Sequence, residues 1–173
     1  MATSIKKRLF ISLVPPPDIT LAAYQALAFI QVDGVISLGS LGFSHETIAV
    51  GDLETGINAA LKGARAGQAA QVSYAARPGD AGQAAVVAAN DGSAEVSLMI
   101  VNPDGVSATF WTGIVHSLMD NEFSVTSHEG AAFTFVPNYP PVRGAPALGG
   151  GPPIGTIAAA TVIDINTIIQ EAA

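Results

Sequence analysis

Cysteine is absent from this chain of 173 residues, which excludes disulfides, thiolate metal sites and cysteine nucleophiles. Charged residues are also scarce, at 12% of the total. Prolines and charges interrupt every apolar run before it reaches the roughly 18 residues of a membrane-spanning helix. We therefore expect no membrane insertion of the subunit. The 49% of hydrophobic residues instead favours contacts between subunits.

The chain is acidic, with a net charge of −7, and residues 78–142 contain no basic residue at all. The seven basic residues are Lys6, Lys7, Arg8, Lys62, Arg65, Arg77 and Arg143. The unopposed acidic residues of that stretch are Asp80, Asp91, Glu95, Asp104, Asp120, Glu122 and Glu129. A surface that grips phosphates needs clustered Lys and Arg. We expect the body to bind no nucleic acid tightly.

The motifs of common enzymes are missing as well, since there is no GxSxG, HExxH or P-loop. His45 and His128 each precede a glutamate, which is not a metal-ligand spacing. Glu46, Asp52 and Glu54 are close enough for acid–base work, but a solvated or intersubunit charge set is favoured in a loop. We predict a chain that is not an enzyme, with no catalytic residue, metal site or cofactor.

A period-two pattern predicts a β-hairpin over residues 95–119. Leu98 and its neighbours at even positions alternate with Met99 and its neighbours at odd positions. The sequence Asn102-Pro103-Asp104-Gly105 follows, in which Pro presets φ and Gly accepts a positive φ. We predict that this turn fixes the register of the hairpin.

The return strand of this hairpin repeats the alternation. One predicted face carries Phe110, Thr112, Ile114, His116 and Leu118, and the other carries Trp111, Val115 and Met119. Gly113 is the candidate for a β-bulge. Phe110 and Trp111 are interpreted as core or interface anchors.

The remaining chain is mostly strand-like. Further strands are expected at residues 35–38, 47–50, 71–75, 122–126 and 132–136, with Phe133 and Phe135 on one side of the last. Residues 18–31 are ambiguous, because Asp18 could cap a helix while residues 26–32 also resemble a buried strand. Asp33-Gly34 indicates a turn.

One helix is expected over residues 80–90. Asp80 is its predicted N-cap, and Gln83 takes the capping-box position. Asn90, Asp91 and Gly92 tolerate the left-handed conformation that ends many helices. Its predicted apolar stripe consists of Ala81, Ala84, Ala85 and Ala88.

Residues 51–67 are rich in Gly and Ala, carry Lys62 and Arg65, and show little alternation. We interpret them as a long loop, a kind of segment that is uncommon unless it is functional. The predicted domains are an N-terminal arm (1–18), a β domain (19–143) and a Gly/Pro linker with a C-terminal arm (144–173). A cleaved signal peptide is the alternative for the basic N-terminus.

The order of three segments resembles the major tail tube proteins of long-tailed, non-contractile (siphovirus-type) bacteriophages. These segments are HETIAVGDLETG, LKGARAGQAAQVSYAARPGDAGQAAVVAA and LMIVNPDGVSATFWTGIVHSL. The resemblance covers residues 30–142. Its most specific parts are the RPGDAGQ run at the helix start and the PDG turn followed by an aromatic strand with Gly113.

The resemblance implies a mainly β fold, an antiparallel β-sandwich or small barrel flanked by one helix, with a long inter-ring loop and extended arms. It implies hexameric rings that self-assemble into the tail tube, a structural conduit of the virion through which viral DNA passes non-specifically into the host. The implied partners are tail-tip, tape-measure and tail-terminator proteins, and assembly would occur in the bacterial cytoplasm.

The resemblance also assigns roles to residues. The inter-ring stacking loop would include Asp52, Leu53, Glu54, Lys62 and Arg65. The intersubunit sheet or lumen hairpin would include Glu95, Asp104, Phe110 and Trp111. The candidate arm contacts are Lys6, Lys7, Arg8 and Asp164.

Two other functions stay open from the sequence. One is a β-sandwich module that binds carbohydrate or another surface through Trp111. The other is the tube protein of a contractile secretion or injection system, which shares the ring architecture.

Overall fold

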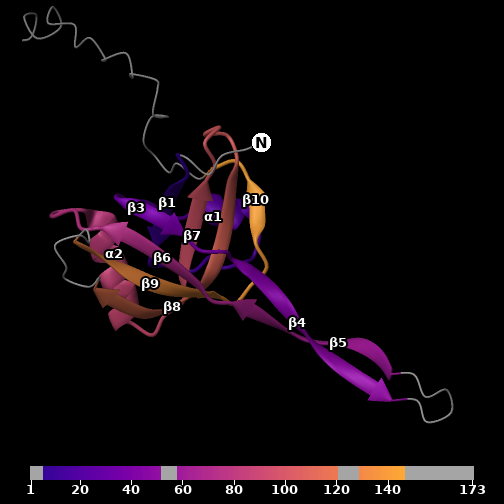
Figure 1. The fold of residues 1–173 in the computed structure, drawn as a ribbon. Helices are drawn as coiled ribbons and strands as arrows, with labels where there is room; N and C mark the ends of the chain where they lie inside the picture. The colour runs from indigo at the N-terminus through magenta and orange to yellow at the C-terminus, as the bar shows by residue number, and fades with distance from the viewer. Residues whose placement is uncertain (1–5, 52–57, 121–128, 147–173) are drawn as a thin grey trace, which may run out of the picture.

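The computed structural model describes residues 6–51, 58–120 and 129–146, which form ten strands and two helices (Figure 1). No helix in these ranges is long and apolar enough to cross a membrane. The elements are β1 Arg8–Ser12, α1 Leu21–Gln25, β2 Ile30–Val32, β3 Val35–Leu38, β4 Gly42–Gly51, β5 Asn58–Gln68, β6 Ala70–Ala75, α2 Ala81–Asp91, β7 Val96–Val101, β8 Ala108–Asp120, β9 Gly130–Pro137 and β10 Val142–Gly144.

The main sheet is antiparallel and curls on itself. Its strand order is β2-β1-β7-β8-β9-β6-β3, and β10 pairs with the start of β8. Although β2 and β3 end this order, only Asp33 and Gly34 separate them in the chain. Gly34 takes a φ of +76° and makes the predicted turn. The sheet must therefore bend until its two ends meet. The order of elements confirms the predicted mainly β fold with one main helix.

Hydrophobic residues cover both faces of the sheet near β7. Leu98 belongs to the larger cluster, with Trp111, Phe133, Phe135 and side chains of α2. Met99 belongs to a second cluster with Phe110 on the opposite face. The predicted alternation of β7 and β9 is thus confirmed, and the strands β7 and β8 form the buried centre of the fold.

The predicted turn between β7 and β8 is confirmed. Gly105 has a φ of +70°, and its N–H donates to the Asn102 carbonyl at 3.0 Å. The Asn102 N–H donates to the Ser107 carbonyl at 2.9 Å. Asp104 accepts hydrogen bonds from the N–H groups of Val106 and Ser107. The hairpin is therefore closed by both backbone and side-chain hydrogen bonds.

The bulge of β8 lies at His116, and the prediction of Gly113 was wrong. Gly113 pairs in register with Val96, whereas the register shifts between Val115 and Ser117. The extra residue turns the later side chains over, so Leu118 packs against the cluster that contains Trp111. Gly113 is needed for a different reason, because a Cβ there would lie 2.0 Å from the Val136 carbonyl oxygen.

The helix α2 begins as predicted, and Asp80 accepts from the Gln83 N–H at 2.9 Å. The predicted stripe was wrong except at Ala85, because the buried residues are Gly82, Ala85, Val86 and Ala89. The Gln83 amide bonds the Asp33 and Ala75 carbonyls instead of completing a capping box. Gly92 ends the helix in an extended conformation with a φ of −85°, so the expected left-handed ending is wrong.

The ambiguous segment before β3 contains both a helix and a strand. Thr20, rather than Asp18, caps α1, and its side chain accepts from the Ala23 N–H at 3.3 Å. Tyr24 of α1 is fully buried, and β2 follows. The N-terminal region was expected to be an arm, yet β1 lies between β2 and β7 with Leu9 and Ile11 buried.

The interpretation of residues 51–67 as an irregular loop was wrong. Strand β5 covers most of that segment and pairs with β4 from Gly42↔Gln68 to Gly51↔Asn58. Two strands can pair without an alternation of apolar and polar side chains. The many Gly and Ala residues of β5 gave no such alternation, so the strand was not predicted. The predicted strand at 122–126 lies outside the described residues.

Candidate assembly surfaces

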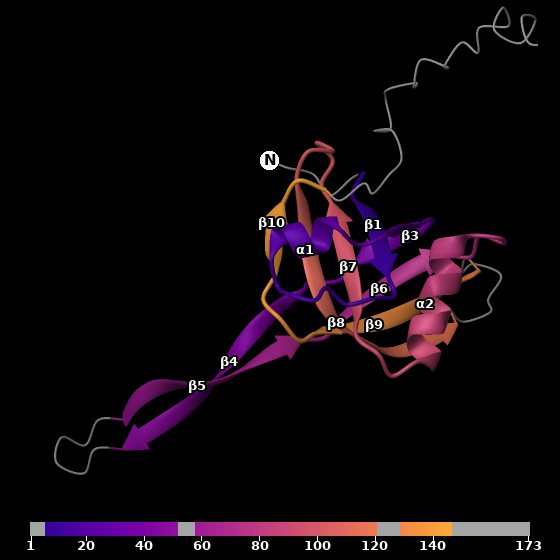
Figure 2. The same cartoon turned by 180° about the vertical axis from the view of Figure 1, so that it is seen from behind.

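The β4–β5 hairpin projects from the body as a separate two-stranded sheet (Figures 1 and 2). Every residue from 44 to 51 is exposed. The base of β5 is held close to β9, since a Cβ at Gly67 would lie 1.9 Å from the Pro137 carbonyl oxygen. An isolated two-stranded hairpin is at best marginally stable in water. The projection therefore has the form of an element that is completed by a partner.

One face of this hairpin carries three large apolar side chains. Ile48 lies directly opposite Leu61, and Val50 follows Ile48 on the same face. These side chains are 49%, 55% and 45% exposed in the same order. We call Ile48, Val50 and Leu61 the hairpin apolar face. An exposed apolar cluster on a thin projection is typical of a protein contact.

The opposite face of the hairpin is basic and is anchored at its base. The Arg65 guanidinium lies 4.2 Å from the centroid of the Phe43 ring, and Lys62 is exposed further along the strand. Phe43 in turn stacks on Trp111 of the body with ring centroids 6.3 Å apart. This chain of contacts joins the hairpin to the core. The structure thus places the two described stacking candidates, Lys62 and Arg65, on one face of one strand.

A second surface lies on the main sheet where no described helix covers it. In Figure 1 strands β6 and β9 lie in front of α2, and Figure 2 shows the helix side. The side chains opposite Phe133 and Phe135 form this surface, and Ser117 donates to Thr134 within it at 3.2 Å. We call it the uncharged face. Its residues are Ser37, Gln71, Ser73, Ala75, Ile114, Ser117, Met119, Ala132, Thr134 and Val136. None of them is Asp, Glu, Lys or Arg.

The hairpin candidates on β7 and β8 divide into two groups. Phe110 is 0% exposed and Trp111 is 6% exposed, so both are core residues and neither side chain is open to a neighbour. Glu95 accepts from the Asn138 amide at 2.7 Å, and Asp104 closes the turn. The burial of Trp111 removes the ring that a carbohydrate site would need.

The remaining predicted site residues are dispersed. Asp52, Leu53, Glu54 and Asp164 lie outside the described residues. Lys6 and Lys7 precede β1 and line a hollow with Arg143, whereas Arg8 is in β1 with its guanidinium 5.8 Å from the centroid of the Phe10 ring. Within the described ranges no cluster of three or more His, Asp or Glu residues could hold a metal ion.

Shifted pKa values occur at structural groups. Burial raises the pKa of Tyr24, whose hydroxyl is 2.7 Å from the Thr112 hydroxyl, and burial also raises the pKa of Tyr74. Hydrogen bonds from Ser107 and Val106 lower the pKa of the Asp104 carboxyl. These groups stabilise the core and a turn, and none forms an acid–base pair.

Comparison with known proteins gives structural similarity only. No family model matches the chain, and no curated protein matches it in sequence. Among solved structures, the SPP1 tail tube aligns with a TM-score of 0.61 at 14% identity, over 84% of this chain and 80% of that chain. The chain has the fold of a tail tube protein.

Two further solved structures share this fold. A chain of the sheath/tube terminator structure of an extracellular contractile injection system aligns with a TM-score of 0.54 at 14% identity, over 84% of this chain and 98% of that one. A chain from the tail of a gene transfer agent particle aligns with a TM-score of 0.53 at 16% identity, over 78% of this chain and 93% of that one. The fold thus occurs in both tails and contractile systems.

Sequence reasoning missed the hairpin apolar face and the uncharged face. The hairpin apolar face was missed because Leu61 lies on β5, which was interpreted as a loop, so its pairing with Ile48 was not considered. The pairs Ile48↔Leu61 and Thr47↔Lys62 would have been found by aligning residues 42–51 against 58–68 in antiparallel register. The second depends on knowing which strands the helices leave uncovered, and the sequence does not contain that information.

Proposed function

We propose that this protein is the structural subunit of a tail tube, which self-assembles into stacked rings and conducts DNA without catalysis. The observation that carries the proposal is the projecting β4–β5 hairpin (Figure 2), whose apolar face is about half exposed among the described residues. The shared fold with the SPP1 tail tube supports it. Six copies per ring and a non-contractile tail are the finer parts of the proposal.

Stacking is assigned to the hairpin. Its apolar face would bury Ile48, Val50 and Leu61 against a subunit of the next ring, at about 25 cal/mol for each Å² removed from water. Lys62 and Arg65 on the other face would meet acidic residues of the neighbouring body, which has no basic residue between positions 78 and 142. Opposite charges at such a contact favour the correct register. Asp52, Leu53 and Glu54 at the hairpin end remain proposed contacts.

The channel wall is assigned to the uncharged face. A wall without Lys or Arg has nothing that holds phosphates, so DNA can slide past it. The acidic residues of the body then need not line the channel, and their negative charge would repel DNA from other surfaces. Ring closure by a repeated head-to-tail contact would also cover strand edges that are open in the subunit.

Shortening the hairpin tests the proposal. Residues 46–64 are replaced by Asn-Gly, which joins the paired positions His45 and Arg65 by a two-residue turn. Negative-stain microscopy should show tubes for the full chain, with tail-initiation partners if these are needed, and none for the shortened chain. The midpoint of thermal unfolding of the shortened chain should differ from that of the full chain by only a few degrees. Tubes of normal length from the shortened chain would contradict the stacking role.

A point variant separates stacking from loss of the hairpin itself. Leu61→Ser should reduce tube yield at least about tenfold, because it places a hydroxyl in the proposed apolar contact. Thr47→Ser on the opposite face is the matched control and should assemble normally. Image averaging of the tubes gives the number of subunits per ring, and a sheath around them in the native particle would favour the contractile alternative.

A further inference from the structure

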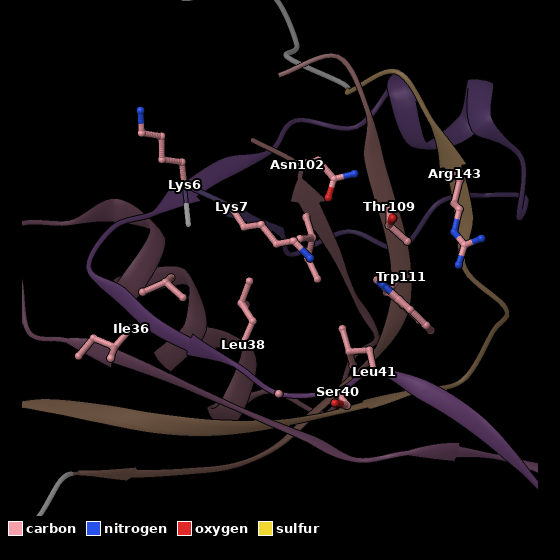
Figure 3. A pocket seen from close by; sticks show the side chains of 13 residues that line it. Lys6, Lys7, Ile36, Leu38, Ser40, Leu41, Asn102, Thr109, Trp111 and Arg143 are labelled. Atoms are coloured by element: carbon pink, nitrogen blue, oxygen red, sulfur yellow. The ribbon is translucent and has the colours of Figure 1, made fainter. Parts of the chain in front are cut away.

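A hollow of about 680 Å³ lies beside β3 and the start of β8 (Figure 3). This volume is within the range of pockets that take small ligands, which is enough room for a few side chains. Its lining comes from the residues before β1, the β3 region, the β7–β8 hairpin and β10. The hollow is separate from both the hairpin apolar face and the uncharged face.

The charge of this hollow has one sign. Lys6, Lys7 and Arg143 line it, and none of its lining residues is Asp or Glu. In the view of Figure 3, Trp111 lies between Lys7 and Arg143. The side chain of Lys6 points away from the hollow in this view (Figure 3), so Lys7 and Arg143 carry its positive charge. A negatively charged group is the complementary ligand.

The lining of the hollow is partly apolar, and Ser40, Asn102 and Thr109 add polar groups to it. Leu38, Leu41 and Ile100 line it and pack partly against the main core. Ile36 at the rim is 55% exposed. A simple inorganic anion would leave this apolar surface uncovered. The hollow therefore fits an occupant that combines apolar side chains with carboxylates.

Residues 147–173 of the same chain have this composition. Their only charged residues are Asp164 and Glu171, and they contain no Lys, Arg or His. Five isoleucines lie near Asp164 in the sequence: Ile157, Ile163, Ile165, Ile168 and Ile169. The segment also follows closely after Arg143, which lines the hollow. Such a short connection gives the segment a high effective concentration at this site.

We propose that the part of the C-terminal segment around Asp164, residues 163–165, docks in this hollow of its own chain, with Asp164 directed to Lys7 and Arg143. The docked segment would lie beside Trp111, on which Phe43 of the β4–β5 hairpin stacks. The proposal does not rest on the tail tube assignment, because it concerns the single subunit. The same segment of a second copy is the competing occupant.

Disulfide trapping tests the docking directly, because the natural chain has no cysteine. Ile36→Cys and Ile165→Cys are combined in the full chain and oxidised under conditions where it is monomeric. The matched control replaces Ile36→Cys by Val87→Cys on α2, a position that is 43% exposed. We expect the first pair to close at least about tenfold faster than the control. Equal rates would overturn the proposal.

Two further measurements identify the occupant and the charge contact. Mixing isotopically labelled and unlabelled chains before oxidation shows by mass whether the bond forms within one chain, and mixed dimers as the main product would overturn docking in the same chain. Lys7→Glu with Arg143→Glu should slow trapping about tenfold, whereas Lys62→Glu should not. An unchanged rate in the double variant would remove the assigned charge contact.

Discussion

Two of the antiparallel hairpins of this protein, β7–β8 and β4–β5, have opposite environments. In β7–β8 both faces are buried, by Leu98 with the first cluster and by Met99 with the second. In β4–β5 both faces are open, with Ile48 and Leu61 about half exposed. The comparison shows that β7–β8 forms the buried centre of the subunit, whereas β4–β5 adds few buried side chains to it, which agrees with the role in assembly that we propose for β4–β5.

The largest expected difference between the hairpins is the cost of removing a side chain. Phe110→Ala in β8 should lower the free energy of unfolding by about 3–5 kcal/mol, because Phe110 is fully buried and stacks on Tyr24 at 5.2 Å. Leu61→Ala in β5 should change it by at most about 0.5 kcal/mol. Urea denaturation of the unassembled subunit measures both values, and equal losses would contradict the comparison.

The sequence was informative where local chemistry sets the structure. The turn at Asn102 and Gly105, the Asp80 cap and the alternation of β7 and β9 were predicted because each depends on a few neighbouring residues. The hairpin β4–β5 was missed because its strands contain Gly63, Gly67 and several alanines, and pairing between two strands leaves no local signal of its own. The pairing of β4 with β5 is set by contacts between residues that lie far apart in the sequence.

The errors in face and position have the same origin. Alternation correctly placed Phe110 and Trp111 on opposite faces, but it could not locate the His116 bulge that brings Leu118 to the core. The buried stripe of α2 was misplaced because Ala84 and Ala88 are as apolar as Ala85 and Ala89, and only the packing against the sheet selects between them. The uncharged face likewise depends on where the helices pack.

A matched pair of glycines should give the next largest difference. At Gly113 in β8 a Cβ would lie 2.0 Å from the Val136 carbonyl oxygen, so Gly113→Ala should cost about 1–3 kcal/mol as the strands move apart. At Gly63 in β5 the nearest atom, the Glu46 carbonyl oxygen, is 3.1 Å away and the strands are free to adjust. Gly63→Ala should therefore leave the thermal midpoint nearly unchanged. A larger loss at Gly63 would show that the hairpin is coupled to the body.

A smaller effect is expected from the polar contact beneath β8. Tyr24→Phe removes the hydroxyl that is 2.7 Å from the Thr112 hydroxyl and should cost about 1 kcal/mol. Thr112 keeps a weaker contact with Ser97 at 3.4 Å. Because burial raises the pKa of Tyr24, its contribution is complete below about pH 10 and is lost as pH rises through the raised pKa. The difference in the free energy of unfolding between the wild type and Tyr24→Phe should become smaller as the pH rises through that range.

The smallest effect concerns the turn of β7–β8. Hydrogen bonds from Ser107 and Val106 lower the Asp104 pKa from its ordinary value of 3.8. Their contribution is present above that value and is lost as pH falls through the lowered pKa. An NMR titration of the Asp104 carboxyl should have its midpoint below 3.8, and Ser107→Ala should move it upward. A midpoint unaffected by that substitution would contradict the turn geometry.

Hydrogen–deuterium exchange of the two hairpins before and after assembly tests the central claim most directly. In the free subunit, amides of β4–β5 should exchange at least about a hundredfold faster than those of β7–β8, because no described residue of the body packs over the outer part of the first hairpin. In assembled tubes the β4–β5 amides should become protected to a similar level. Strong protection of β4–β5 in the free subunit, or no gain on assembly, would contradict its role as the stacking element.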